Sequence, residues 1–283
     1  MKLFDLNCKV VLITGASGGI GQAVAQRFYE RGANLVLTDI AQDDLNRTFA
    51  SMNSDRVLLV PLDVTDMLAT KAVVQQAIKR FGRLDMVMAN AGISAREPST
   101  LLTISEEEFA KVMNVDLFGV WNTVKASLPD LIKARGHVLI TASVYAFVNG
   151  VANAPYAMSK AAVEQLGRAL RAELSGTGAT AGVLYPGWVD TKLAKVAFGG
   201  HDIATRLVNH GMPGLFRRLV QPDAIAQAVV AGVERRAARI IAPKLWVPIS
   251  LFRGIFNALT DAVLDKDATF QKLIRELERE QKR

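Results

Sequence analysis

The sequence predicts a single α/β domain built on a doubly wound parallel sheet. Short apolar runs rich in β-branched residues alternate with longer amphipathic stretches along most of the 283 residues, which is the rhythm of parallel strands joined by helical crossovers. The runs are continuously apolar, as expected for strands covered on both faces. A glycine-rich turn follows the first run, and sheets of this type bind ligands at the carboxyl ends of their strands.

The elements follow in order along the chain. The apolar runs predict six strands, at residues 10–14, 34–39, 57–62, 84–90, 137–142 and 180–185. The amphipathic stretches between them predict helices, among them residues 20–31, 66–81, 106–133 and 156–174. We therefore expect one domain at residues 1–243 and a helical C-terminal extension at residues 244–283.

Composition and charge narrow the class of protein. With 50% hydrophobic and 22% charged residues, the chain can bury a sizeable core and is not a disordered protein. Cys8 is the only cysteine and the N-terminus lacks a signal-peptide pattern, so a reducing, cytoplasmic location is the expectation. The net charge of +7 is concentrated in residues 201–283, which hold 14 basic and 9 acidic side chains. No zinc-finger spacing, aromatic RNA-binding motif or dense lysine block accompanies them, so we expect no nucleic-acid partner.

The first functional motif is TGASGGIG at residues 14–21. Its glycines allow a tight turn, close approach of the backbone to a pyrophosphate, and packing of the following helix. The positive end of that helix would face the phosphates. The alternative is a glycine-rich turn without a ligand. The cofactor-binding residues predicted in this loop are Gly15, Ser17, Gly19, Ile20 and Gly21.

Asp39 ends the second predicted strand, 18 residues beyond Gly21. A carboxylate at that position can accept hydrogen bonds from the adenosine ribose hydroxyls and would repel a 2′-phosphate. Asp39 therefore favours NAD over NADP as the cofactor. The alternative is that Asp39 only caps the helix that begins near Gln42.

Tyr156 and Lys160 lie four residues apart on a predicted helix, so both side chains emerge on one face, about 6 Å apart along the axis. A nearby ammonium group stabilises phenolate. Lowering a tyrosine pKa from about 10 to about 7 takes about 4 kcal/mol, which the lysine and a cationic nicotinamide ring could supply together. Ser143 closes the fifth predicted strand, and Asn114 lies on the long preceding helix.

With these residues in place, the chain resembles the short-chain dehydrogenase/reductase family. The matching motifs are TGASGGIG, Asp63 in Leu62-Asp63-Val64, Asn90-Ala91-Gly92, Asn114, Ser143, Tyr156-x-x-x-Lys160 and Pro186-Gly187, in the family's order and spacing over residues 7–240. The resemblance implies a Rossmann fold and a nicotinamide cofactor. It also implies that residues 187–220 form a lid.

The resemblance assigns four catalytic residues. Tyr156 would exchange a proton with the substrate oxygen, and Lys160 would hold the nicotinamide ribose and lower the tyrosine pKa. Ser143 would hydrogen-bond the substrate oxygen, and Asn114 would help to relay the proton to solvent. Further cofactor contacts are implied at Asp63, Val64, Asn90, Gly92, Pro186, Val189 and Thr191. We expect no metal, because His137, His201 and His210 lack ligand spacing and are predicted at the surface or in loops.

The lid is unusually apolar, which favours a hydrophobic substrate. Its apolar residues are Trp188, Leu193, Val196, Phe198, Ile203, Leu207, Met212, Leu215 and Phe216, and Ile93, Tyr145 and Phe147 are expected to approach from other loops. The alternative is that the lid residues pack on the body of the protein. The predicted function is NAD-dependent interconversion of a hydrophobic secondary alcohol and its ketone. The alternatives are a 3-oxoacyl thioester reductase and a non-catalytic dinucleotide-binding regulator.

Two surfaces suggest larger assemblies. Helices 106–133 and 156–174 carry apolar residues, and core packing accounts for most of them. By resemblance, the same helices also pair subunits in a homodimer or homotetramer. Residues 245–264 form an apolar stretch interrupted by Arg253, Asn257 and Asp261. This pattern predicts an amphipathic element. It either contacts a membrane surface peripherally or docks on its own domain or another subunit.

Overall fold

The computed structural model describes residues 3–52, 54–195 and 199–281, and within them seven parallel strands form one sheet. The strands are β1 (Val10–Thr14), β2 (Asn34–Asp39), β3 (Val57–Pro61), β4 (Met86–Ala89), β5 (His137–Thr141), β6 (Thr180–Pro186) and β7 (Arg239–Ala242). Their order is β3-β2-β1-β4-β5-β6-β7. The direction of strand addition reverses between β1 and β4, where a ligand crevice is expected. The predicted doubly wound α/β fold is confirmed.

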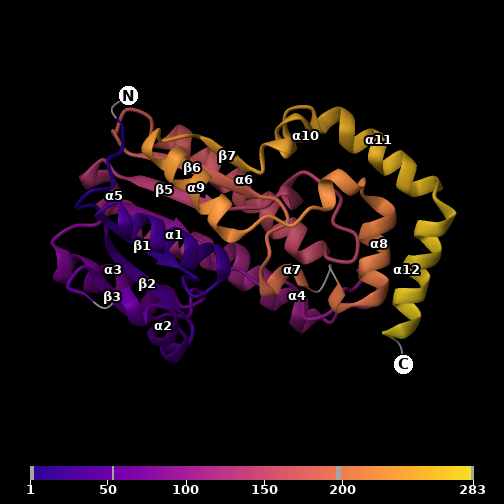
Figure 1. Cartoon of the computed structure of the whole chain (residues 1–283), viewed down its shortest axis with the longest axis horizontal. Helices are drawn as coiled ribbons and strands as arrows, with labels where there is room; N and C mark the ends of the chain where they lie inside the picture. Colours follow the sequence, from indigo (N-terminus) through magenta and orange to yellow (C-terminus); the bar gives the residue numbers. More distant parts are fainter. Residues whose placement is uncertain (1–2, 53, 196–198, 282–283) are drawn as a thin grey trace.

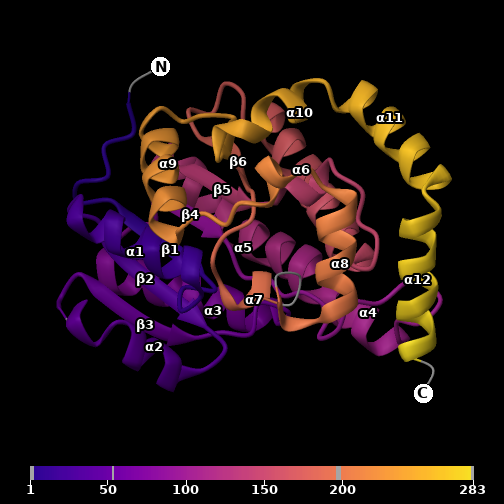
Figure 2. The ribbon, with the colours of Figure 1, turned by 45° about the vertical axis from the view of Figure 1, so that its right-hand side comes forward.

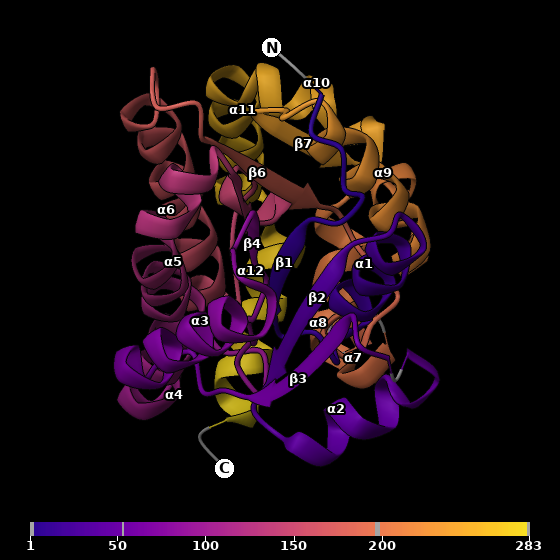
Figure 3. The ribbon, with the colours of Figure 1, turned by 90° about the vertical axis from the view of Figure 1, so that its left-hand side faces the viewer.

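Helices cover both faces of the sheet (Figure 3). One layer holds α1 (Gly19–Glu30) and α9 (Pro222–Glu234), which pack against each other. The opposite layer holds α3 (Met67–Phe81), α5 (Val120–Ala134) and α6 (Ala154–Glu173). The remaining helices of the first 211 residues are α2 (Gln42–Thr48), α4 (Glu106–Met113), α7 (Lys192–Lys195) and α8 (Asp202–Gly211).

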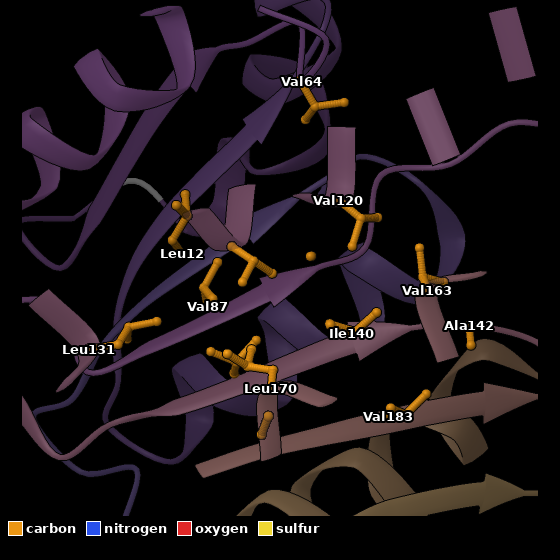
Figure 4. Close-up of a cluster of buried hydrophobic side chains, with 14 of the residues drawn as sticks. Leu12, Val64, Val87, Val120, Leu131, Ile140, Ala142, Val163, Leu170 and Val183 are labelled. Carbon is orange, nitrogen blue, oxygen red and sulfur yellow. The ribbon is translucent and has the colours of Figure 1, made fainter. Parts of the chain in front are cut away.

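Each face of the sheet has its own apolar core, because successive strand residues point to opposite sides. On β1, Val10 and Leu12 belong to the core under α3, α5 and α6, whereas Val11 and Ile13 belong to the core under α1 and α9. Figure 4 shows the first of these cores, where strand residues such as Ile140 meet helix residues. This double burial explains why the strands are continuously apolar in sequence.

The prediction of one continuous α-helix over residues 106–133 is wrong. The chain forms α4, then a π-helical segment at Asn114–Gly119, then α5. Gly119 permits close packing there, since a Cβ atom on it would lie 2.5 Å from a methyl carbon of Val64. Insertions of this kind often accompany functional sites because they change the phase of the helix.

Two further differences from the sequence predictions concern strands. The edge strand β7 was not predicted, since its four residues are too few to show a periodicity. His137 was expected at the surface or in a loop, but it is fully buried on β5, with Nδ1 2.8 Å from the Thr180 hydroxyl. Burial, with the charges of Arg236 and Arg171, lowers its pKa to about 3, so the ring is neutral at pH 7.

The C-terminal extension contains three α-helices that arc around α8 (Figures 1 and 2). They are α10 (Val247–Leu251), α11 (Arg253–Lys266) and α12 (Ala268–Glu280). Trp246, just before α10, is buried in the main core. At the far end, α12 packs its apolar face on Ile203 and Leu207 of α8. The extension is therefore attached to the domain at its beginning and at its end.

Candidate functional site

The carboxyl ends of the central strands surround a cavity of about 120 Å³. Its lining joins residues that are far apart in sequence: Ile20 from the glycine loop, Ser143 after β5, and Tyr156 on α6. Pro186, the last residue of β6, lines the same cavity with Val189 and Thr191, which follow that strand. The predicted cofactor end and the predicted catalytic end of the site thus meet in one place.

The glycine loop between β1 and α1 has the shape of a phosphate cradle. Gly15 has φ of +62°, and a Cβ atom on it would lie 2.7 Å from the Cα atom of Ala91. A Cβ atom on Gly19 would lie 2.7 Å from a methyl carbon of Thr191, and one on Gly21 would lie 2.4 Å from the carbonyl oxygen of Gly15. Each predicted glycine therefore stands where a side chain would clash.

The same loop fits a dinucleotide phosphate chemically. The Ser17 hydroxyl oxygen is buried and has no hydrogen-bond partner within the described chain. Gly18, the N-cap of α1, supplies no side chain to cap the helix, so its first N–H groups remain available for an anion. An orphaned hydroxyl beside free helix N–H groups is a suitable donor set for a pyrophosphate.

Asp39 lies at the end of β2 and faces the glycine loop. One carboxylate oxygen accepts a hydrogen bond from the backbone N–H of Ser17 at 2.9 Å, and the other accepts from that of Ile40 at 2.8 Å. The N-cap of α2 is Ala41, and no side chain caps that helix. The alternative that Asp39 is only a helix cap is therefore wrong.

Asn90 ties three strand ends together. Its amide nitrogen donates to the carbonyl oxygens of Thr14 and Gly15 at 3.1 and 3.2 Å, and its side-chain oxygen accepts from the Thr141 hydroxyl at 3.2 Å. These hydrogen bonds link the carboxyl ends of β1, β4 and β5 at the base of the crevice.

Asp63 and Val64, which follow β3, are predicted to border the adenine. Asp63 is exposed, whereas the side chain of Val64 is buried in the core.

Lys160 lies at the base of the site in a buried ion pair with Asp116. The Lys160 Nζ atom is 3.0 Å from Asp116 Oδ2, with 3% and 0% of the two side chains exposed. Asp116 Oδ1 accepts a hydrogen bond from the backbone N–H of Ile93 at 2.7 Å. Gly92 leaves room for this pair, since a Cβ atom on it would lie 3.1 Å from Nζ. Nζ is also 5.2 Å from the centre of the Tyr156 ring.

The pKa of the Tyr156 hydroxyl depends on its burial and on the charges of the Lys160–Asp116 pair. Burial raises the pKa of Tyr156, while the Lys160 charge and a hydrogen bond with Ser143 lower it, and burial dominates. Asp116 opposes the effect of Lys160 and raises the pKa of Tyr156 further. The pKa of Lys160 is raised despite burial, because Asp116 and Tyr156 favour the ammonium form. The Lys160 charge lowers the pKa of Tyr156, but it does not outweigh the effect of burial.

The structure does not bring Asn114 into this cluster. Asn114 is exposed at the start of the π-helical segment, whereas Asp116, two residues later, is buried beside Lys160. The expected position of Asn114 in the site is therefore wrong, and Asp116 occupies that place. A signal was present in the sequence: Asp116 lies four residues after Val112 and four before Val120, both buried, and so on the apolar face of the helix.

The predicted apolar residues divide among several environments. Tyr145, Trp188, Leu193 and Leu207 line the catalytic cavity. Phe147, Met212 and Phe216 line a neighbouring cavity, Ile203 packs on α12, Ile93 packs beside Tyr156, and Leu215 is exposed. Val196 and Phe198 lie outside the described residues. Some lid residues thus pack on other parts of the chain, as the alternative prediction had it.

Comparisons with known proteins agree with this geometry. A family profile described as short chain dehydrogenase matches residues 9–202. The chain is 34% identical to the meso-2,3-butanediol dehydrogenase of Serratia marcescens, over 65% of the chain and 73% of that protein. It is 30% identical to the 3-oxoacyl-[acyl-carrier-protein] reductase of Thermotoga maritima, over 80% of the chain and 90% of that protein. Its fold matches a short chain dehydrogenase/reductase from Burkholderia phymatum in complex with NAD, with a TM-score of 0.79 and 24% identity, over 94% of this chain and 98% of that one.

Proposed function

The chain belongs to the short-chain dehydrogenase/reductase family, and from this premise we propose that it interconverts a hydrophobic secondary alcohol and its ketone with NAD as cofactor. Members of the family are oxidoreductases that bind a nicotinamide dinucleotide. The observation that carries the proposal is the single cavity in which Ser143 and Tyr156 meet Ile20, Val189 and Thr191. A proton donor and a cofactor cradle converge there.

When bound, the nicotinamide supplies or accepts the hydride at its C4 atom, while the chain manages the proton. In the oxidative direction the Tyr156 oxygen accepts the hydroxyl proton of the alcohol, and in the reductive direction it returns that proton to the ketone oxygen. Ser143 hydrogen-bonds the same substrate oxygen and holds it near Tyr156. Lys160 would bind the nicotinamide ribose, and its ion pair with Asp116 holds the lysine side chain in position.

The cofactor would lie along the carboxyl edge of the sheet. The N–H groups of the Gly15–Gly21 loop and the Ser17 hydroxyl would bind the pyrophosphate, and Asp39 the adenosine ribose. Asp63 and Val64 would border the adenine, with Asn90 and Gly92 in the central crevice. Pro186, Val189 and Thr191 would contact the carboxamide.

A panel of hydrophobic alcohols and ketones, assayed with NAD(H) and NADP(H), tests this function directly. We expect turnover of secondary alcohols with NAD to exceed turnover with NADP. Including a 3-oxoacyl thioester tests the nearest alternative, to which the Thermotoga relative's name points. Turnover of the thioester alone would replace our proposal. Binding of dinucleotide without turnover of any substrate would support a regulator instead.

For cofactor choice we predict that Asp39→Ala raises the KM for NAD about tenfold and lowers the KM for NADP. Two ribose hydroxyls lose a charged acceptor, and a 2′-phosphate no longer meets a carboxylate. Steady-state kinetics with both cofactors would measure this change. Asp43→Ala, which removes an exposed carboxylate on the neighbouring helix α2, is the control and should leave both constants unchanged. An unaltered NAD preference in Asp39→Ala would contradict the assignment.

We also propose that the molecule pairs with a second copy through the outer side of α5 and α6. Val112, Val124, Val163 and Leu170 are used in the core, but Phe118, Trp121 and Met158 are exposed at 53%, 44% and 48%. Phe118 lies in the π-helical segment just before α5, Trp121 at the start of α5 and Met158 on α6, and exposed aromatic and methionine side chains are typical of a subunit interface. The expected assembly is a homodimer or a homotetramer.

We predict that Trp121→Glu reduces the molecular mass in solution to that of a smaller assembly, because a charge would be buried at the interface. Light scattering coupled to size-exclusion chromatography measures this mass. Leu68→Glu, at a residue of α3 that is 75% exposed, is the matched control and should keep the parent mass. If both variants have the parent mass, this face is not the interface.

The outer face of α11 is proposed to rest on an anionic lipid surface. Phe252, Ile255, Leu259 and Val263 form one row on the helix and are 57–64% exposed. The helix itself has two basic and two acidic side chains, but over residues 201–283 basic side chains outnumber acidic ones by 14 to 9. An exposed apolar row on a helix within a basic region suits an anionic lipid surface. In the described part of the chain no single helix is long and apolar enough to cross a bilayer. Residues 244–251 and α11 pass that test of length and composition only as a pair bent by 89°.

We predict that the double variant Ile255→Glu, Leu259→Glu lowers recovery with anionic vesicles in a flotation assay at least about tenfold, since two apolar side chains leave the lipid. Leu68→Glu again serves as the control. Unchanged flotation of the double variant would refute the proposal. So would a fall in molecular mass of the double variant without lipid, because the face would then bind another subunit.

A further inference from the structure

A second and larger cavity, of about 360 Å³, lies between the body of the domain and the C-terminal extension. We call it the tail chamber. Its walls come from the segment after β5, the lid and the extension. The lining residues are Tyr145, Phe147, Val148, Asn149, Val151, Trp188, Leu207, Val208, Gly211, Met212, Pro213, Phe216, Trp246, Ile249, Phe256, Asn257, Thr260, Leu264 and Phe270. At about 30 Å³ for each water molecule, this volume corresponds to about twelve water molecules.

The tail chamber adjoins the catalytic cavity. Five residues line both spaces: Tyr145, Val151, Trp188, Leu207 and Val208. The Tyr145 ring packs edge to face against Tyr156 on one side, with ring centres 5.5 Å apart, and against Trp188 on the other, at 5.4 Å. The two spaces therefore lie side by side, and the Tyr145 and Trp188 rings line both of them.

The chamber is chemically suited to hydrocarbon. None of the lining residues named above carries a charge. Two of its polar residues are engaged within the protein, since the Asn149 amide donates to Asp261 Oδ1 at 3.0 Å and the Thr260 hydroxyl donates to the carbonyl oxygen of Phe256 at 2.9 Å. The aromatic rings of Phe216 and Trp246 lie 4.9 Å apart at the inner end. Such a lining offers little to a polar ligand and much apolar surface to an alkyl chain.

The space is held open by the way the extension is attached. Arg253 of α11 places Nη1 2.8 Å from both carboxylate oxygens of Glu164 on α6, and only 5% of the Glu164 side chain is exposed. At the other end, Phe270, Leu273 and Leu277 of α12 pack on α8. An unfilled apolar cavity costs stability because its walls lose packing contacts. These braces maintain a space that close packing would otherwise remove.

We propose that the tail chamber binds the aliphatic tail of the substrate, so that the enzyme acts on long-chain secondary alcohols or ketones. This inference rests on the proposed oxidoreductase function and specifies its substrate class. The hydroxyl or carbonyl group lies at Ser143 and Tyr156, and the chain passes Tyr145 and Trp188 to reach Phe216 and Trp246. Each methylene group that enters the chamber is expected to raise kcat/KM up to about fourfold until the chamber is full.

The test uses straight-chain alcohols with the hydroxyl on the second carbon, from short to long, with saturating cofactor. We expect kcat/KM to rise with chain length and then level off. Thr260→Phe places a ring in the chamber at an exposed position of α11. It should lower kcat/KM for the longest alcohols at least about tenfold and leave the shortest unchanged. Ala262→Phe, exposed on the same helix and outside the chamber lining, is the control and should match the parent enzyme.

A binding measurement separates this inference from the catalytic proposal. Trp188 and Trp246, two of the three tryptophans, line the chamber. A fatty chain carrying a nitroxide should therefore quench tryptophan fluorescence in the parent protein and in Ala262→Phe, and less in Thr260→Phe. Quenching without oxidation of any alcohol would refute the proposed function and keep the chamber as a tail site. Oxidation of short alcohols with neither a gain from chain length nor quenching would refute the chamber. An equal loss in both variants would also refute it.

Discussion

Replacing Tyr156 by phenylalanine is expected to lower kcat for alcohol oxidation at least about a hundredfold, because the substrate oxygen loses its proton acceptor. The substitution keeps the ring, which packs against Tyr145 in the wall of the cavity, so cofactor binding and folding should be retained. Steady-state kinetics with a saturating secondary alcohol measures the loss, and dinucleotide binding by fluorescence shows that the site is intact.

Tyr145→Phe is the matched control for this experiment. Tyr145 lines the same cavity and contacts both Tyr156 and Trp188 through its ring, but the proposed mechanism gives its hydroxyl no proton to transfer. Its kcat should stay within about fivefold of the parent value. A near-normal rate for Tyr156→Phe would remove Tyr156 from the mechanism, whatever the control does.

The second large effect is expected at Asp116. Asp116→Leu leaves the Lys160 ammonium buried without its partner, and breaking a buried pair in this way typically costs about 3–5 kcal/mol of unfolding free energy. Urea unfolding at neutral pH measures that loss. The variant should also lose activity, since Lys160 is no longer fixed beneath the cofactor site. Unchanged stability would show that the pair contributes nothing to the fold.

Asp116→Asn examines the electrostatic role of the same residue with little change in shape. The carboxylate raises the pKa of Tyr156, so its removal should lower that pKa. The phenolate form accepts the proton from the alcohol, and the rising limb of kcat/KM against pH should therefore move to lower pH. A limb at the parent position would mean that Asp116 does not act on Tyr156.

The sequence predicted the fold and most of the crevice because these depend on local patterns. Continuous apolar strands and a glycine loop leave a direct signature, and Gly15, Ser17 and Asp39 lie beside one another as their positions after β1 and β2 imply. Asn114 was assigned by its resemblance to the family's motif and not by its position on a helix face. Its side chain is exposed, whereas Asp116, four residues after Val112, is buried beside Lys160.

The chamber beside the site was beyond prediction for a different reason. Its walls combine Phe147, Trp188, Trp246 and Phe256, which no periodicity relates. Tertiary packing brings them together: Phe147, Trp188 and Trp246 share the main core, and the pairing of Arg253 with Glu164 places the helix that carries Phe256. His137 shows the same effect on a smaller scale, since the surrounding elements, and not its own residue type, bury it.

The attachment of α12 to α8 has a consequence for the timing of catalysis. Because Ile203 and Leu207 share an apolar cluster with Phe270, Leu273 and Leu277, α8 cannot swing outward alone without exposing that cluster to water. The end of α12 is in turn held to the body of the domain, because the Gln281 amide donates to the carbonyl oxygen of Pro98 and to the Ser99 hydroxyl. Outward movement of α8 is therefore expected to require that these bonds or the shared cluster break first, which would slow product release under the proposed function.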